Sequence, residues 1–131
     1  MVRLHRIVPG IVLCVLLAAA PVSLAQPAGG TTHELADTTV SASGNTTIIA
    51  GVAAKVIRVK RFEIFCNGAN NVTLKDTAGA VLRATRNLGA GQGWINDWSD
   101  YAWYTTGTGA GLVLNLSTTQ ACNVTAVYTQ G

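Results

Sequence analysis

Histidine, the side chain that enzymes use most often for acid–base chemistry, is almost missing from this chain. There are two histidines among 131 residues, and only His33 lies beyond residue 25. His33 falls in a short segment without hydrophobic periodicity, so a nucleophile activated by a histidine base is not expected. The glycine-rich stretch 89–93 lacks the Lys-Ser/Thr ending of a phosphate-binding loop. We therefore expect no catalytic residues and no enzyme activity.

Charged residues are also scarce, at 11% of the chain. Beyond residue 25, seven basic side chains balance six acidic ones, which leaves a net charge of +1. Nucleic-acid binding usually needs a strong positive field, so no nucleic-acid partner is expected. Zinc sites need more histidines or cysteines, and Asp97 and Asp100 are not part of a calcium-loop pattern. We expect neither a metal nor another cofactor.

Long apolar runs are missing too, and the main short one covers residues 11–20. It follows a basic start, is ended by Pro21, and precedes small residues that culminate in Ala25. This pattern predicts a secretory signal peptide, residues 1–25, cleaved before Gln26. The run is about half as long as the roughly 20 residues that a membrane-spanning helix needs. We therefore expect a secreted or periplasmic protein with no membrane span after cleavage.

Two cysteines, Cys66 and Cys122, remain after that cleavage. In an oxidising compartment an even pair predicts a disulfide, and two free buried thiols are the alternative. The chain between them is long, so chain-entropy arithmetic gives a stabilisation of about 4 kcal/mol.

The rest of the chain is predicted to form one domain, residues 37–131, after a flexible leader, residues 26–36. Helical spacing is nearly absent. Short runs rich in Val, Ile, Thr and aromatic residues are bounded by Gly, Asn and Asp instead. This organisation predicts an all-β fold, a small antiparallel β-sandwich or barrel.

Alternation of apolar and polar residues locates the clearest strands. Val72 and Leu74 face the core, and residues 76–79 form a turn into a second strand at 81–83, which predicts a hairpin. Two later strands each bury one face, and their inward residues are Leu112, Leu114 and Leu116 in one, and Cys122, Val124, Ala126 and Tyr128 in the other.

The segment 55–66 breaks the two-residue period. Its apolar residues change parity between Val59 and Phe62, so a regular strand would not bury all of them on one face. Either a β-bulge near Lys60–Arg61 restores the phase, or the strand bends between two sheets. Cys66 is in phase with Phe62, and Cys122 is in phase with Val124. Both cysteines are therefore expected to point inward.

Four basic residues lie close together in the same segment. Such a stripe is typical of a solvated face or a protected sheet edge, and contact with an anionic partner is the alternative. The stripe consists of Lys55, Arg58, Lys60 and Arg61.

Three stretches of the chain resemble a pattern common in small accessory proteins of phage virions. They are Thr47–Val59, Asn71–Asp76 and Gly111–Ser117, and the likeness covers about Thr38 to Thr129 in the same order. In that family the pattern forms a compact, jelly-roll-like sandwich that decorates heads or builds fibres and tails. The signal peptide and the cysteine pair depart from the family. The resemblance therefore implies a jelly-roll-like fold and a module reused for an extracytoplasmic role.

All three tryptophans and two of the three tyrosines fall within residues 94–104. Exposed indole rings stack on sugar rings, and Asn and Asp side chains accept hydrogen bonds from sugar hydroxyls. Trp and Tyr also anchor protein interfaces, and a third interpretation is that some of these rings cap the core. The candidate binding or interface residues are Trp94, Asn96, Asp97, Trp98, Asp100, Tyr101, Trp103 and Tyr104.

These features favour a secreted, non-enzymatic structural or interaction module that forms a homo-oligomer or binds another protein. The alternative is a carbohydrate-binding domain that holds a polysaccharide against residues 94–104. Solvent-exposed indole rings in a shallow groove would support the alternative, and buried rings would argue against it.

Overall fold

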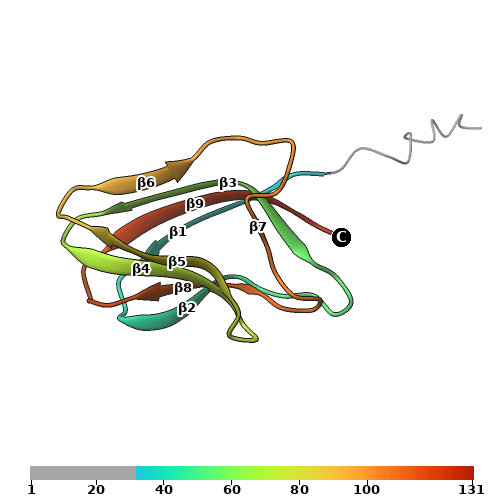
Figure 1. Cartoon of the computed structure of the whole chain (residues 1–131), viewed down its shortest axis with the longest axis horizontal. Helices are drawn as coiled ribbons and strands as arrows, with labels where there is room; N and C mark the ends of the chain where they lie inside the picture. The colour runs from blue at the N-terminus through green and yellow to red at the C-terminus, as the bar shows by residue number, and fades with distance from the viewer. Residues whose placement is uncertain (1–31) are drawn as a thin grey trace, which may run out of the picture. The chain divides into compact units, whose positions relative to one another are not determined.

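A computed structural model describes residues 32–131, and this part of the chain is built from β-strands (Figure 1). No helix in this part is long and apolar enough to cross a membrane. The predicted signal peptide and most of the predicted leader lie outside the described residues. The strands are β1 (Glu34–Val40), β2 (Gly44–Ile49), β3 (Ile57–Cys66), β4 (Asn70–Asp76), β5 (Val81–Leu88), β6 (Gly93–Asn96), β7 (Tyr104–Thr105), β8 (Leu112–Leu116) and β9 (Cys122–Gln130).

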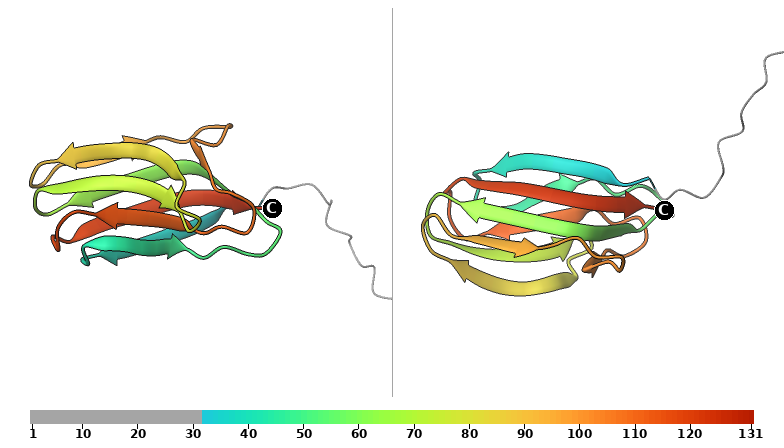
Figure 2. Two further views of the ribbon diagram at one scale, coloured as in Figure 1. Left: turned by 60° about the horizontal axis from the view of Figure 1, so that its bottom comes forward. Right: turned by 90° about the horizontal axis from the view of Figure 1, so that it is seen from above.

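The strands form two antiparallel sheets that pack face to face (Figures 1 and 2). Sheet A has the order β1-β9-β3-β6, with β7 also paired to β3, and sheet B has the order β2-β8-β4-β5. The chain crosses between the sheets after each of its first three strands. Later, β8 lies between β2 and β4 in sheet B, and β9 lies between β1 and β3 in sheet A. This order is that of a jelly roll. The expected all-β, jelly-roll-like sandwich is confirmed.

Strand β1 begins at Glu34, three residues before the predicted start of the domain at Asp37. The added residues complete the ladder with β9, in which Glu34 lies opposite Tyr128 and Ala36 lies opposite Ala126. Sequence alone gave no signal for this extension, because residues 34–36 become a strand only through their partner.

The inner faces of the two sheets form one hydrophobic core. The leucines of β8 and the alternate residues of β9 are buried, as their periodicity predicts. Val113 points to the outer face of sheet B but is also buried, since it is flanked by Thr47 on β2 and Lys75 on β4. The most fully buried large side chains are Phe62, Ile57, Ile64, Leu74, Leu112, Leu114 and Leu116.

Strand β3 contains the predicted bulge. Its register with β9 shifts between Val59 and Arg61, so Lys60 is left without a register partner on that strand. The extra residue restores the phase, and Ile57, Val59, Phe62 and Ile64 are all 0% exposed on the same inner face. A single irregularity thus keeps the whole ten-residue strand amphipathic.

The predicted disulfide joins neighbouring strands of sheet A. Cys66 ends β3 and lies opposite Cys122, the first residue of β9, with their Cα atoms 4.0 Å apart. Both side chains are buried, as their phase with the apolar residues predicts. The bond therefore fixes the register of the two central strands of sheet A at one end.

The predicted hairpin joins β4 to β5 through a turn at residues 76–80. Asp76 is 4% exposed, and its two carboxylate oxygens accept hydrogen bonds from the backbone N–H groups of Ala80 (2.9 Å) and Gly107 (3.1 Å). Gly79 adopts a positive φ of 94°, which favours glycine. Asp76 thus connects the hairpin turn to the segment that follows β7.

Candidate functional site

The aromatic segment divides into a buried part and an exposed part. Trp94 on β6 and Tyr104 on β7 are 7% and 6% exposed. Their rings pack on Phe62 of β3 with centroid separations of 5.2 and 6.2 Å, and lie 6.0 Å from each other. These two aromatic residues therefore cap the core, and they are not available to stack on a ligand.

Asn96 belongs with the buried part. Its Oδ1 atom accepts a hydrogen bond of 2.6 Å from the hydroxyl of Tyr104. Burial raises the pKa of Tyr104, although the positive charges of Arg83 and Arg86 oppose that shift. The hydroxyl is therefore neutral near pH 7 and holds the end of β6 against β7.

The loop between β6 and β7, residues 97–103, carries the exposed part. Trp98 and Trp103 are 50% and 49% exposed, and Tyr101 is 85% exposed. Exposed aromatic side chains that gather in one place are typical of a contact surface. We call residues 97–103 the aromatic loop.

The bulge of β3 anchors the aromatic loop. The backbone carbonyl of Lys60 accepts a hydrogen bond from Ser99 N (3.1 Å), and its ammonium group donates to the carbonyl of Asp100. Trp103 N donates to the carbonyl of Val59 at 2.8 Å. Because Lys60 lies at the register shift, its polar groups are free to hold the loop.

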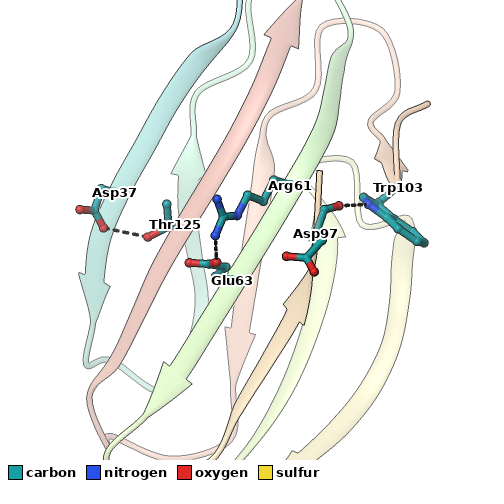
Figure 3. A network of polar contacts seen from close by, with 6 residues as sticks. All are labelled: Asp37, Arg61, Glu63, Asp97, Trp103 and Thr125. Carbon is teal, nitrogen blue, oxygen red and sulfur yellow. Dashed lines mark hydrogen bonds and ion pairs between the residues drawn. The ribbon is translucent and has the colours of Figure 1, made fainter. Parts of the chain in front are cut away.

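The loop also has an internal contact. The indole Nε1 of Trp103 donates a hydrogen bond of 2.6 Å to the carbonyl oxygen of Asp97 (Figure 3). This contact closes the loop on itself and fixes the orientation of the Trp103 ring. The loop is therefore ordered, and these hydrogen bonds hold its aromatic rings in defined positions.

Asp97 and Asp100 contribute to the loop through their backbone carbonyls, and both residues are exposed. In residues 32–131, no group of three or more His, Cys, Asp or Glu residues is arranged to hold a metal ion. The sequence placed these two residues in the candidate site, and the structure brings both of them beside Trp98 or Trp103.

A pocket of about 220 Å³ lies beside Trp98 and is lined by His33, Lys60, Ser99 and Asp100 as well. His33 meets the Trp98 ring edge-on, with the ring centroids 4.5 Å apart and the planes at 64°. One side of the Trp98 ring is therefore occupied by the chain that leads into β1. No local sequence pattern indicates this contact, because His33 precedes Trp98 by 65 residues.

Three of the four residues of the predicted basic stripe have local partners for their side chains. Arg61 forms an ion pair with Glu63 on the outer face of sheet A, where Asp37 also accepts a hydrogen bond of 3.2 Å from Thr125 (Figure 3). Lys60 binds the aromatic loop, and Arg58 donates to the carbonyl of Gly131 at 3.4 Å. This arrangement matches the solvated-face interpretation of the stripe.

A groove of about 590 Å³ runs between the edge strands β5 and β6. Two arginines of β5 lie over the Trp94 ring, with the guanidinium carbons of Arg83 and Arg86 at 5.9 and 5.2 Å from its centroid. Sequence reasoning missed this site, because the arginines and the tryptophan are on different sheets. The groove is also lined by Ala84, Thr85, Asn87, Leu88, Gly93 and Ile95.

Comparison of the chain with protein-family models gives no match, and comparison with curated proteins gives no significant match. The geometry of the aromatic loop and of the arginine groove is therefore the basis for assigning a function.

Proposed function

We propose that this protein is a non-enzymatic structural or interaction module that works outside the cytoplasm, and that the aromatic loop contacts a protein partner. The signal-peptide pattern and the cysteine pair support export, because disulfides persist in oxidising compartments. The jelly-roll frame and the resemblance to virion accessory proteins support a role in assembly rather than in chemistry.

The observation that carries this proposal is the exposure of Trp98, Tyr101 and Trp103 on one anchored loop. Tryptophan and tyrosine are the residues most enriched among the energetically dominant contacts of protein interfaces. An ordered loop also loses little conformational entropy when it binds, which favours affinity. The loop thus has both the side chains and the rigidity of a contact surface.

The shape of this surface favours a protein over a sugar. Sugars bind on flat aromatic faces in shallow grooves, whereas the pocket beside Trp98 is small and His33 covers part of the ring. Tyr101 is the most exposed of the three aromatic residues, at 85%, as a side chain that inserts into a partner's pocket would be.

The test is site-specific photo-crosslinking in the cells that produce the protein. A benzophenone amino acid replaces Tyr101, and the control carries it at Thr119, which is also exposed. We expect a discrete crosslinked protein from position 101 that is absent from position 119 and lost when Trp98→Ala and Trp103→Ala are added. If position 101 gives no crosslinked protein beyond the control, the proposal is overturned.

The second candidate function is carbohydrate binding, and the half-exposed rings of Trp98 and Trp103 beside Asp97 and Asp100 favour it. Titration of the purified protein with cell-wall and extracellular polysaccharides tests it by tryptophan emission. A saturable shift that is lost in Trp98→Ala or Trp103→Ala supports this function. The Trp94→Phe variant is the control. Because Trp94 is buried, its replacement should not alter an emission shift that arises at the loop.

A further inference from the structure

The groove between β5 and β6, which we call the arginine groove, contains two positive charges without an acidic partner. Arg86 lies opposite Val72 of β4, and Arg83 lies opposite Leu74. The side chains of both partners are in the core, so both arginines occupy inner-face positions of an edge strand. Neither takes part in the ion pair that is found within residues 32–131. The groove therefore presents two guanidinium groups at the open side of the sandwich.

Trp94 holds both arginines in place. The two side chains are exposed, and their guanidinium carbons lie 5.9 and 5.2 Å from the centroid of the Trp94 ring. A guanidinium group over an indole ring is attracted to it, and a side chain that is already held loses less entropy when it binds a ligand. Guanidinium groups match carboxylates through two parallel hydrogen bonds. The arginine groove is thus prepared for a ligand with two carboxylates.

The spacing of the arginines fits an extended peptide. Their register partners on β4, Val72 and Leu74, are two residues apart and share a face, which corresponds to about 7 Å along a strand. Alternate side chains of any extended chain share a face and repeat at the same distance. Two carboxylates separated by one residue can therefore meet both guanidinium groups.

The two strands that border the arginine groove each lie at the end of a sheet. Within residues 32–131, β5 pairs with β4 alone and β6 pairs with β3 alone, so each has one backbone edge without a strand partner. The β4–β5 ladder shifts register twice, which disturbs further pairing along β5. Strand β6 keeps a regular register with β3 from Gly93 to Asn96. An added strand therefore fits along β6, as in β-augmentation.

The neighbours of such an added strand favour alternating acidic and apolar residues. Trp94 lies opposite the buried Ile64, so the inward side chains of a strand beside β6 enter the arginine groove. On the outer face, Ile95 is 48% exposed and available to an apolar side chain. A sugar has less to bind, because the Trp94 ring is 7% exposed and lies under the guanidinium groups.

We propose that the arginine groove binds an extended acidic segment of a partner protein, which pairs with the free edge of β6 and places alternate carboxylates on Arg83 and Arg86. The inward arginines also disfavour strands that lack acids, which gives the edge specificity. This inference goes beyond the proposed contact of the aromatic loop and uses a separate surface. Peptide binding in the groove and the crosslink from position 101 can therefore fail independently of each other.

The test is a titration of the purified protein with a short capped peptide in which Val flanks and separates two Glu residues. Isothermal titration calorimetry measures the affinity. In the variant Trp98→Phe/Trp103→Phe, Trp94 is the one remaining indole, so a change in its emission places the peptide at the groove. We expect saturable binding that weakens with added salt, because screening shortens from about 10 Å at 0.1 M to about 3 Å at 1 M.

Two control peptides separate charge from spacing. One has Gln in place of both Glu residues, and the other has its two Glu residues adjacent, so that they point to opposite faces of an extended chain. Each should bind at least about tenfold more weakly, because it loses hydrogen bonds between charged groups. These comparisons use the unmodified protein, so they do not depend on the folding of a variant.

Substitutions in the groove test the same contact from the other side. Arg83→Gln/Arg86→Gln should weaken binding by at least about tenfold. The matched control, Lys55→Gln/Lys75→Gln, removes two positive charges away from the groove and should bind as the unmodified protein does. Arg83→Lys/Arg86→Lys keeps both charges without the paired hydrogen bonds, so it should bind more weakly than the unmodified protein. Circular dichroism and thermal unfolding show whether each variant keeps the fold.

The proposal is overturned if the alternating peptide does not bind, if the control peptides bind equally well, or if bound peptide leaves the emission of Trp94 unchanged. It is also overturned if polygalacturonate binds in place of the peptide and Arg83→Gln/Arg86→Gln abolishes this, since the groove then holds an acidic polysaccharide. Self-association that the same variant abolishes, without peptide binding, would assign the groove to a second copy of the chain instead.

Discussion

The ring of Phe65 on β3 lies over Gly93 on β6, in the space that a side chain at position 93 would occupy. The two residues are register partners on the outer face of sheet A. A Cβ atom on Gly93 would also come within 2.8 Å of the carbonyl oxygen of Ile64. Glycine is therefore required at the point where β6 joins the sheet and starts the segment that leads to the aromatic loop.

Replacement of Gly93 by Ala should destabilise the fold by about 1 to 3 kcal/mol, since the methyl group must displace an aromatic ring and a backbone carbonyl. Urea unfolding of the variant measures the loss. Adding Phe65→Ala should recover part of it, because the ring is then absent and only the clash with the carbonyl remains. If the losses in free energy of unfolding from the two single substitutions simply add in the double variant, this account is contradicted.

Removal of the disulfide by Cys66→Ala/Cys122→Ala should lower the free energy of unfolding by about 4 kcal/mol, as expected for a loop of this length. The sequence separation of the two cysteines is 56 residues, so the bond restricts much of the unfolded chain. Urea unfolding of the oxidised, reduced and doubly substituted proteins measures the effect. Reduced and substituted proteins should agree, and a loss below about 1 kcal/mol would show that the bond adds little beyond the strand pairing.

Substitution of Asp76 by Asn should cost about 1 to 3 kcal/mol, because the amide can accept one of the two backbone hydrogen bonds but not both. The backbone N–H group of either Ala80 or Gly107 then has no acceptor. Asp76→Ala should cost more than Asp76→Asn, since both acceptors are lost. Thermal unfolding of the two variants gives the order, and the reverse order would show that the carboxylate has a different role.

The stability of the protein should fall above pH 10 because of Tyr128. Burial, followed by its hydrogen bond to Glu34 and the negative charge of that residue, raises the pKa of Tyr128 to about 12. Below pH 10 the hydroxyl is neutral in both the folded and unfolded chains, and its stabilising contribution is complete. Above pH 10 the unfolded chain ionises first, so this contribution is lost between about pH 10 and pH 12, at up to about 1.4 kcal/mol per pH unit.

Urea unfolding midpoints measured from pH 9 to pH 12 test this prediction. The decline in Tyr128→Phe should be shallower than in the unmodified protein, because phenylalanine has no proton to lose. The decline in Glu34→Gln should also be shallower, since this substitution removes the negative charge that helps to raise the pKa of Tyr128. Equal slopes in all three proteins would show that other groups cause the alkaline loss.

The sequence by itself determined the fold class, and it located the irregularity of β3 and the one available cysteine pair. The structure decided that the irregularity is a bulge and that the two thiols are joined. Period-two alternation in short β-branched runs is a local property, so it identified β8, β9 and the β4–β5 hairpin without knowledge of their neighbours. The parity change between Val59 and Phe62 located the bulge of β3. A single cysteine pair left one pairing to test, and the phase of Cys66 and Cys122 showed that both point inward.

Only the tertiary structure decided which aromatic residues are exposed. Trp94, Trp98 and Trp103 are chemically identical, and their burial depends on whether Phe62 and Tyr104 or solvent lie beside them. The arginine groove was equally invisible, because β5 and β6 belong to different sheets and meet only when the sandwich forms. Contacts between strands distant in the sequence have no local pattern, and in this protein those contacts create both proposed surfaces.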